Sequence, residues 1–125
     1  MRMLIAAAAA ATLAGCGPTR ADIADQRALA EARAIGAPVE CIALSSIRNT
    51  RVRDEQTIDF YTNGRRVFRN TLPESCPLLG FERRFTYKTS TSQLCSIDVV
   101  NVITTTGRGP TCRLGMFQPI ETRFR

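Results

Sequence analysis

The sequence has no histidine and no tryptophan, and Lys88 is its single lysine. Without histidine there is no Ser-His-Asp triad or Cys-His dyad, no His-ligated zinc site and no imidazole proton shuttle near neutral pH. Most hydrolase chemistry is excluded with them. The composition therefore predicts no catalytic residues, no metal and no cofactor.

The chain also lacks an apolar run long enough to span a bilayer as a helix, which takes about 20 residues. Its longest run, from Met3 to Leu13, follows a basic head at Arg2 and ends in small residues. This pattern is typical of a secretory signal peptide, so residues 1–15 are predicted to be one. The rest of the 125 residues has the size of one domain.

The apolar run leads directly into Leu13-Ala14-Gly15-Cys16. This tetrapeptide resembles the lipobox of bacterial lipoproteins, in which the signal peptide is cut before the cysteine and that cysteine is acylated. The resemblance implies lipidation of Cys16 and a lasting anchor, because three acyl chains hold far better than one. In lipoproteins of enteric-type bacteria an aspartate in the next position retains the protein at the inner membrane. Gly17 stands there instead, which implies the periplasmic face of the outer membrane. An ordinary cleaved signal peptide with an incidental cysteine is the alternative.

Four cysteines remain after the anchor: Cys41, Cys76, Cys95 and Cys112. An even set in an exported chain predicts two disulfides. No pair has the Cys-x-x-Cys spacing of redox enzymes. Three pairings are possible, and Cys41–Cys95 with Cys76–Cys112 is favoured because it most naturally places each pair on neighbouring strands.

Removal of residues 1–15 takes away Arg2 and no acid, which leaves 16 basic and 11 acidic residues. A basic chain ordinarily raises nucleic acid as a partner, but export excludes it here. Besides the membrane that holds the lipid anchor, the expected partners are anionic lipid, lipopolysaccharide or another envelope protein. Guanidinium groups bind phosphate and carboxylate in a bidentate fork, so the candidate anion-binding residues are Arg65, Arg66, Arg83 and Arg84. A dispersed, solvated set of arginines is the alternative.

Residues 16–20 contain Gly17 and Pro18 and are predicted to form the lipid-anchored tether. Residues 21–36 are predicted to be helical, because acidic residues stand at the start and a glycine stands at the end. The apolar stripe of this helix is weak. It is therefore predicted to pack loosely, as a spacer.

Residues 40–122 are rich in β-branched and aromatic residues and are predicted to form a disulfide-stapled β-domain. Asn63-Gly64 is the strongest hairpin signal, since both residues tolerate the positive φ of a type I′ turn. The predicted fold is mainly β, a small antiparallel barrel or sandwich of SH3-like or OB-like size preceded by one short helix. The expected strands are residues 41–47, 56–62, 65–70, 83–88, 94–105 and 112–117.

The pattern of this region is Cys-x-x-Leu-x-x-Ile from Cys41, an Asn-Gly hairpin, Leu72–Leu79, Leu94–Asp98 and Cys112–Gly115. Over about residues 40 to 120 it resembles a family of short proteobacterial envelope proteins of unknown function. The resemblance implies no activity.

Few residues are arranged for chemistry. Asp54 and Glu55 are adjacent, so their side chains point apart and predict a solvated turn. Asp98 lies in an apolar stretch and is predicted to make structural hydrogen bonds. Gly107-Arg108-Gly109 predicts a hairpin loop. The sequence thus favours a non-enzymatic binding or structural module; the alternative is an envelope enzyme that acts on a saccharide or phosphoester with Asp and Arg residues.

Overall fold

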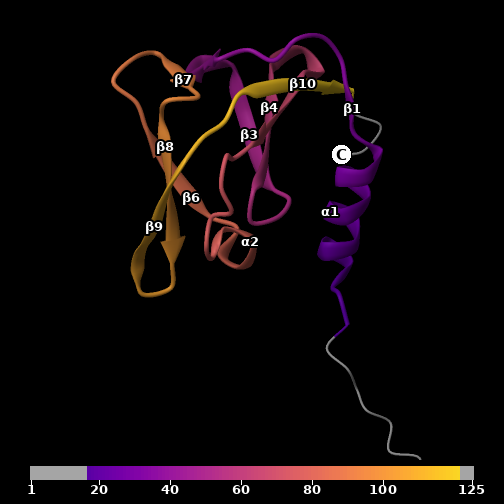
Figure 1. The fold of residues 1–125 in the computed structure, drawn as a ribbon, viewed down its shortest axis with the longest axis vertical. Coiled ribbons are helices and arrows are strands. Elements are labelled where there is room, and N and C mark those ends of the chain that lie inside the picture. Colours follow the sequence, from indigo (N-terminus) through magenta and orange to yellow (C-terminus); the bar gives the residue numbers. More distant parts are fainter. Residues whose placement is uncertain (1–16, 122–125) are drawn as a thin grey trace, which may run out of the picture.

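The computed structural model describes residues 17–121, so the predicted signal peptide and Cys16 lie outside the described residues. The fold is mainly β with one main helix at the N-terminal side, as predicted (Figure 1). Its elements are α1 (Arg20–Glu31), β1 (Arg33–Ala34), β2 (Cys41–Ala43), β3 (Ile47–Val52), β4 (Thr57–Thr62), β5 (Val67–Thr71), α2 (Leu79–Glu82), β6 (Phe85–Lys88), β7 (Gln93–Cys95), β8 (Val99–Thr104), β9 (Gly107–Arg113) and β10 (Phe117–Glu121).

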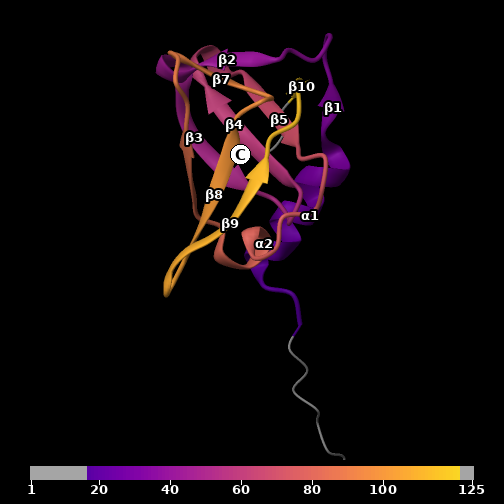
Figure 2. The ribbon, with the colours of Figure 1, turned by 60° about the vertical axis from the view of Figure 1, so that its left-hand side comes forward.

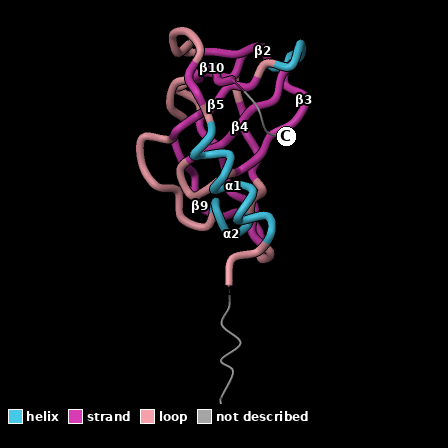
Figure 3. Tube along the Cα trace, turned by 90° about the vertical axis from the view of Figure 1, so that its right-hand side faces the viewer, coloured by secondary structure: helices cyan, strands magenta, loops and turns pink. Residues whose placement is uncertain are grey.

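The strands form three antiparallel sheets that do not close into a barrel. A five-stranded sheet has the order β1-β10-β5-β4-β3, a three-stranded sheet has the order β6-β8-β9, and β2 pairs with β7. The five-stranded sheet lies between the three-stranded sheet and α1 (Figures 1 and 2). Seen from the side of the helix, α1 lies across the strands of the larger sheet, with α2 near its lower end (Figure 3).

The hydrophobic core lies between the larger sheet and the three-stranded sheet. Phe60 of β4 makes edge contacts with Phe117 of β10, at 5.3 Å between ring centroids, and with Phe85 of β6, at 6.3 Å. Such contacts stabilise beyond the area that the rings bury. The other fully buried apolar side chains of this cluster are Ile58, Leu72, Leu79, Leu94, Val100, Val102 and Leu114.

Three of the expected strands are wrong as continuous elements: 41–47, 94–105 and 112–117. The 112–117 strand divides between β9 and β10. Expected strand 41–47 divides at a 3₁₀ turn, Leu44–Ser46, into β2 and β3, which belong to different sheets. Expected strand 94–105 divides into β7 and β8, and Ile97 between them is 76% exposed. Asp98 stabilises that turn, because its Oδ2 accepts a 2.8 Å hydrogen bond from the Cys95 N–H. The structural role predicted for Asp98 is confirmed. The chain turns here because β7 and β8 belong to different sheets.

The remaining expected strands differ mainly at their ends. The 56–62 strand is confirmed as β4, but β5 begins two residues later than expected, because the positive φ values fall on Gly64 and Arg65 rather than on Asn63 and Gly64. The hairpin is therefore confirmed, and its left-handed pair of residues lies one position later than predicted. The 83–88 strand is present from Phe85 onward as β6, because Arg83 and Arg84 follow directly on α2.

Helix α1 ends earlier than residue 36 and is not a loose spacer. A capping box starts it, with Thr19 and Asp22 hydrogen-bonded to each other's backbone N–H. After Glu31 the chain becomes extended, and β1 pairs with β10. The helix thus begins one residue before the predicted start and ends at Glu31, and β1 lies within the stretch predicted to be helical.

Both disulfides of the favoured pairing are present. Cys41–Cys95 joins residues that face each other in the β2-β7 pair, with a Cα–Cα distance of 4.0 Å. Cys76–Cys112 ties the segment before α2 to β9, with a Cα–Cα distance of 5.8 Å. Cys76 lies in a loop, so only the first bridge links two strands.

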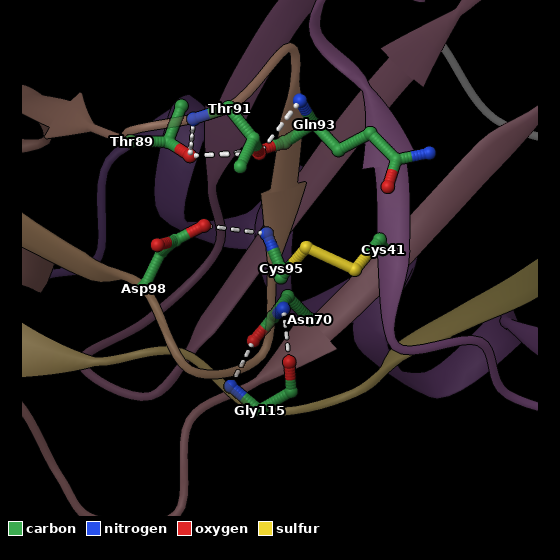
Figure 4. Close-up of a disulfide and its surroundings, with 8 residues drawn as sticks. All are labelled: Cys41, Asn70, Thr89, Thr91, Gln93, Cys95, Asp98 and Gly115. Atoms are coloured by element: carbon green, nitrogen blue, oxygen red, sulfur yellow. Dashed lines mark hydrogen bonds between the residues drawn. A yellow bond between two sulfur atoms is a disulfide. The ribbon is translucent and has the colours of Figure 1, made fainter.

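An amide pair closes the turn between β9 and β10 beside the first disulfide (Figure 4). The buried Asn70 donates to the Gly115 carbonyl at 2.7 Å, and its Oδ1 accepts from the Gly115 N–H at 2.8 Å. The two backbones are so close that a Cβ on Gly115 would stand 2.2 Å from the Thr71 carbonyl oxygen. Only glycine fits this position.

Gly115→Ala should lower the free energy of unfolding by about 3 kcal/mol or more, because the methyl group displaces backbone and breaks the Asn70 pair. Urea unfolding followed by circular dichroism measures this change. Gly17→Ala is the matched control, since nothing lies within 4 Å of its Cβ, and should stay within about 0.5 kcal/mol. Equal stability of the two variants would contradict the close approach at Gly115.

Non-reducing peptide mapping should join Cys41 to Cys95 and Cys76 to Cys112, with no alkylation of these four thiols before reduction and complete alkylation after it. Alkylation of any of the four in the unreduced protein would contradict the two bridges. A different pairing would contradict the pairing in the structure.

Candidate functional site

The four arginines proposed as an anion-binding patch are not brought together. Arg65 and Arg66 follow β4, at the turn into β5. Arg83 and Arg84 follow α2, which is held near the other end of β4. There the Glu55 carbonyl accepts a 2.7 Å hydrogen bond from the Cys76 N–H. A six-residue strand is about 20 Å long, so two pairs of arginines stand at opposite ends of it.

Instead, the larger sheet and α1 share a network of charged side chains, the ionic network, which sequence reasoning missed. It begins with a row across the sheet, in which Asp59 of β4 stands opposite Arg51 of β3 and Arg69 of β5. Ile58 and Phe60 face the core, so Asp59 faces the helix side. The members of the ionic network are Asp22, Asp25, Arg51, Arg53, Asp59, Arg69 and Arg83.

Arg53 is the centre of the ionic network. Its Nε donates to Asp59 at 2.9 Å, its Nη1 to Asp25 at 2.8 Å and its Nη2 to the Tyr61 hydroxyl at 2.8 Å. The residue is 4% exposed, while Asp25 and Asp59 are 1% and 0% exposed. The guanidinium group thus lies between a helix carboxylate and a strand carboxylate.

Two further arginines complete the ionic network. Arg69 holds both oxygens of Asp59, at 2.8 Å through Nε and 2.9 Å through Nη2. Arg83 reaches from the end of α2 to Asp22 and Asp25, both at 2.5 Å. Arg83 is therefore occupied by the fold and is not an open anion site.

Neighbouring groups shift the pKa values of Arg53 and Asp22. Burial by itself would lower the pKa of Arg53, but hydrogen bonds to Asp59 and Asp25 outweigh it, so the pKa is raised and the group stays charged. The pKa of Asp22 is lowered, first by its hydrogen bonds with Thr19 and then by Arg83. Its contribution to stability is complete above the ordinary value of 3.8 and is lost as the pH falls through the lowered folded value.

The ionic network holds α1 on the sheet, because Asp25 of the helix and Asp59 of β4 share Arg53. Within residues 17–121, every buried side-chain nitrogen and oxygen has a hydrogen-bond partner. The same residues contain no group of three or more Cys, Asp or Glu side chains placed to hold a metal ion. The cluster that most resembles an active site by composition is therefore a structural clamp.

Arg53→Met should lower the free energy of unfolding by about 3 kcal/mol, because it breaks a buried ion pair to each of Asp25 and Asp59. Asp59 then keeps Arg69, and Asp25 keeps Arg83 and Arg51. The matched control is Arg51→Met, which removes a 41% exposed side chain whose contact to Asp25 is 3.4 Å, and should cost less than about 1 kcal/mol. Urea unfolding measures both. Equal losses would show that Arg53 is not the centre of the clamp.

A groove of about 840 Å³ lies at the end of the molecule where β2 and the β4-β5 turn are found. Three stretches of the chain line it, within residues 35–46, 62–68 and 119–121. Ile35 and Val39 expose 52% and 40% of their surface, and Ile120 lies deeper. Arg65 and Arg66 line the same groove.

The lining combines apolar side chains with Arg65, Arg66 and Glu121, so its net charge is positive. Such a groove suits a ligand that has an apolar body and an anionic group. Of the four arginines predicted to bind anions, only Arg65 and Arg66 line this groove. The groove could not be read from the sequence, since its three stretches lie far apart along the chain. The Asn-Gly hairpin is the signal that placed the two arginines at a tip.

These features define a class: a small, mainly β, disulfide-bonded domain with a docked N-terminal helix and an open groove. The sequence model of a family of unknown function, DUF6491, matches residues 1–123, so the chain belongs to that family. The comparison with curated proteins gives no match, and neither does the comparison with solved structures. Within residues 17–121, neither helix has the length and apolar character needed to cross a membrane.

Proposed function

We propose that the protein is a lipoprotein of the cell envelope, anchored through Cys16 at the periplasmic face of the outer membrane, and that its domain is a non-enzymatic binding or structural module. The observation that carries this proposal is the Leu13-Ala14-Gly15-Cys16 motif behind an apolar run. Two disulfides in the domain that follows support it, because disulfides persist in oxidising compartments and not in the cytosol.

The short distance between anchor and domain is consistent with a module held at the membrane. Only three residues separate Cys16 from Arg20, the first residue of α1. The last of the three, Thr19, already belongs to the capping box. A fully extended chain spans at most about 3.3–3.6 Å per residue, so the four steps from Cys16 to Arg20 reach about 14 Å.

The aspartates favour a non-enzymatic role over hydrolysis of a saccharide or phosphoester. Asp22, Asp25 and Asp59 are hydrogen-bonded to other groups in the ionic network. Asp54 accepts from the Gln56 N–H and Asp98 from the Cys95 N–H. Each of the five aspartates thus serves the fold, and the residues that line the groove include none of them.

The groove is the part of the domain that this proposal assigns to binding. It lies at the end of the fold away from α2 and the start of α1, so an anchored domain would turn it toward other envelope components. Anionic lipid, lipopolysaccharide or an acidic segment of another envelope protein has the chemistry that Arg65, Arg66 and the apolar lining would recognise.

Cys16→Ser should leave the protein unacylated and move it from the membrane pellet to the soluble fraction, because the domain would keep no acyl chain. Fractionation of envelopes and the mass of the N-terminal peptide measure this. Gly17→Ala keeps the cysteine and is the matched control; it should stay in the pellet. A Cys16→Ser protein that pellets and resists a salt wash would contradict the anchor, and wild type in the inner-membrane fraction would contradict the sorting.

A further inference from the structure

The end of the domain nearest the anchor carries an exposed apolar turn that the fold does not use. Leu78 directly precedes α2 and exposes 46% of its surface, and Phe81 lies within α2 and exposes 82%. Leu79, between them in sequence, is fully buried in the core. The turn therefore anchors one leucine inside and presents its two other large apolar side chains to the outside.

The backbone of this turn is held in an unusual shape. Leu78 before the helix and Arg83 after it both have positive φ, at 69° and 57°. This left-handed conformation is costly for residues other than glycine and is found where the surrounding structure enforces it, often at functional sites. Here the Glu82 and Arg83 N–H groups donate to the Leu78 and Leu79 carbonyls, at 2.8 and 2.9 Å.

The ionic network places this turn beside the start of α1. Arg83 binds Asp22 in the first turn of α1 at 2.5 Å, and α2 lies at the same end of the molecule as that first turn in both ribbon views (Figures 1 and 2). Ile23, in the same first turn of α1, is 47% exposed. Three exposed apolar side chains thus belong to two neighbouring segments, the first turn of α1 and the α2 turn, at the end of the described chain that is next to Cys16 in sequence.

We infer that this face, made of Ile23, Leu78 and Phe81, lies in the interface of the bilayer that holds the acylated Cys16, and forms a second membrane contact. The inference rests on the proposed lipid anchor. Apolar side chains of interfacial segments enter a bilayer by about 5–10 Å, and the four-residue reach of about 14 Å brings the face to that surface. Arg84, 61% exposed at its side chain, stands next to the lipid headgroups.

The contact would fix the orientation of the domain. One flexible anchor alone leaves a domain free to rotate about it, whereas a second contact at the same end makes the long axis of the molecule stand away from the membrane. Burial of one apolar side chain in the bilayer contributes at most about 1.5–3 kcal/mol of binding free energy. Two or three such side chains therefore do not hold the domain at the membrane without the anchor. The groove would then point away from the bilayer.

The absence of tryptophan allows a direct test. Phe81→Trp introduces the only tryptophan into the full acylated protein, which is reconstituted in phosphatidylethanolamine and phosphatidylglycerol vesicles with brominated acyl chains. We expect blue-shifted emission and strong quenching by the brominated lipid. The matched control is Ile97→Trp, because Ile97 is 76% exposed beside β7, at the other end of the fold. Its emission should stay solvent-like, with quenching several-fold weaker.

Three outcomes separate the inference from the proposal on which it rests. Strong quenching at position 81 and weak quenching at position 97 supports the second contact. Equal quenching, or none at position 81, in protein whose N-terminal peptide carries the acyl mass would overturn it and leave the anchor intact. An N-terminal peptide without acyl mass would overturn the anchor, and the membrane contact with it. Circular dichroism of both variants confirms the fold.

Discussion

The buried guanidinium group of Arg53 is the interaction on which the arrangement of the domain depends. It joins Asp25 of α1 to Asp59 of β4, and each of these carboxylates is essentially inaccessible to water. A buried charge is costly unless it is paired and hydrogen-bonded, so the helix and the sheet each need the other to satisfy their charges. Removing Arg53 takes a buried partner from both carboxylates at once and breaks the direct link between helix and strand.

The same network decides what the two ends of the molecule can do. Arg83 extends it from α1 to the end of α2, and so holds the exposed Leu78 and Phe81 beside the start of the helix. At the other end, β1 continues from the helix and pairs with β10, and Ile35 just after it lines the groove. Helix α1, which ion pairs hold against the larger sheet, therefore runs between the exposed apolar side chains at one end of the domain and the groove at the other. An anchor at Cys16 would place the first at the membrane and the second away from it.

Arginine-rich composition suggested an anion-binding surface, but several of these side chains form ion pairs within the fold. Arg53, Arg69 and Arg83 pair with aspartates inside the domain. Arg65 and Arg66 alone of the proposed four line the groove. A count of charges in a sequence does not distinguish a guanidinium group that holds the fold from one that faces a ligand, because the distinction is a matter of burial and partners.

The sequence by itself determined the features that depend on local pattern or on covalent chemistry. β-branched and aromatic runs predicted the mainly β fold, Asn63-Gly64 predicted the hairpin, and four cysteines predicted the two bridges. Tertiary structure decided the rest. The hydrophobic stripe of α1 predicted loose packing, but the helix docks through Asp25, and ion pairs between distant segments leave no periodic signal. The interruptions of the strands at residues 44–46 and 96–98 also depend on tertiary structure, as do the α2 turn and the groove. Each arises where segments distant in sequence meet, because packing and not local preference sets its shape.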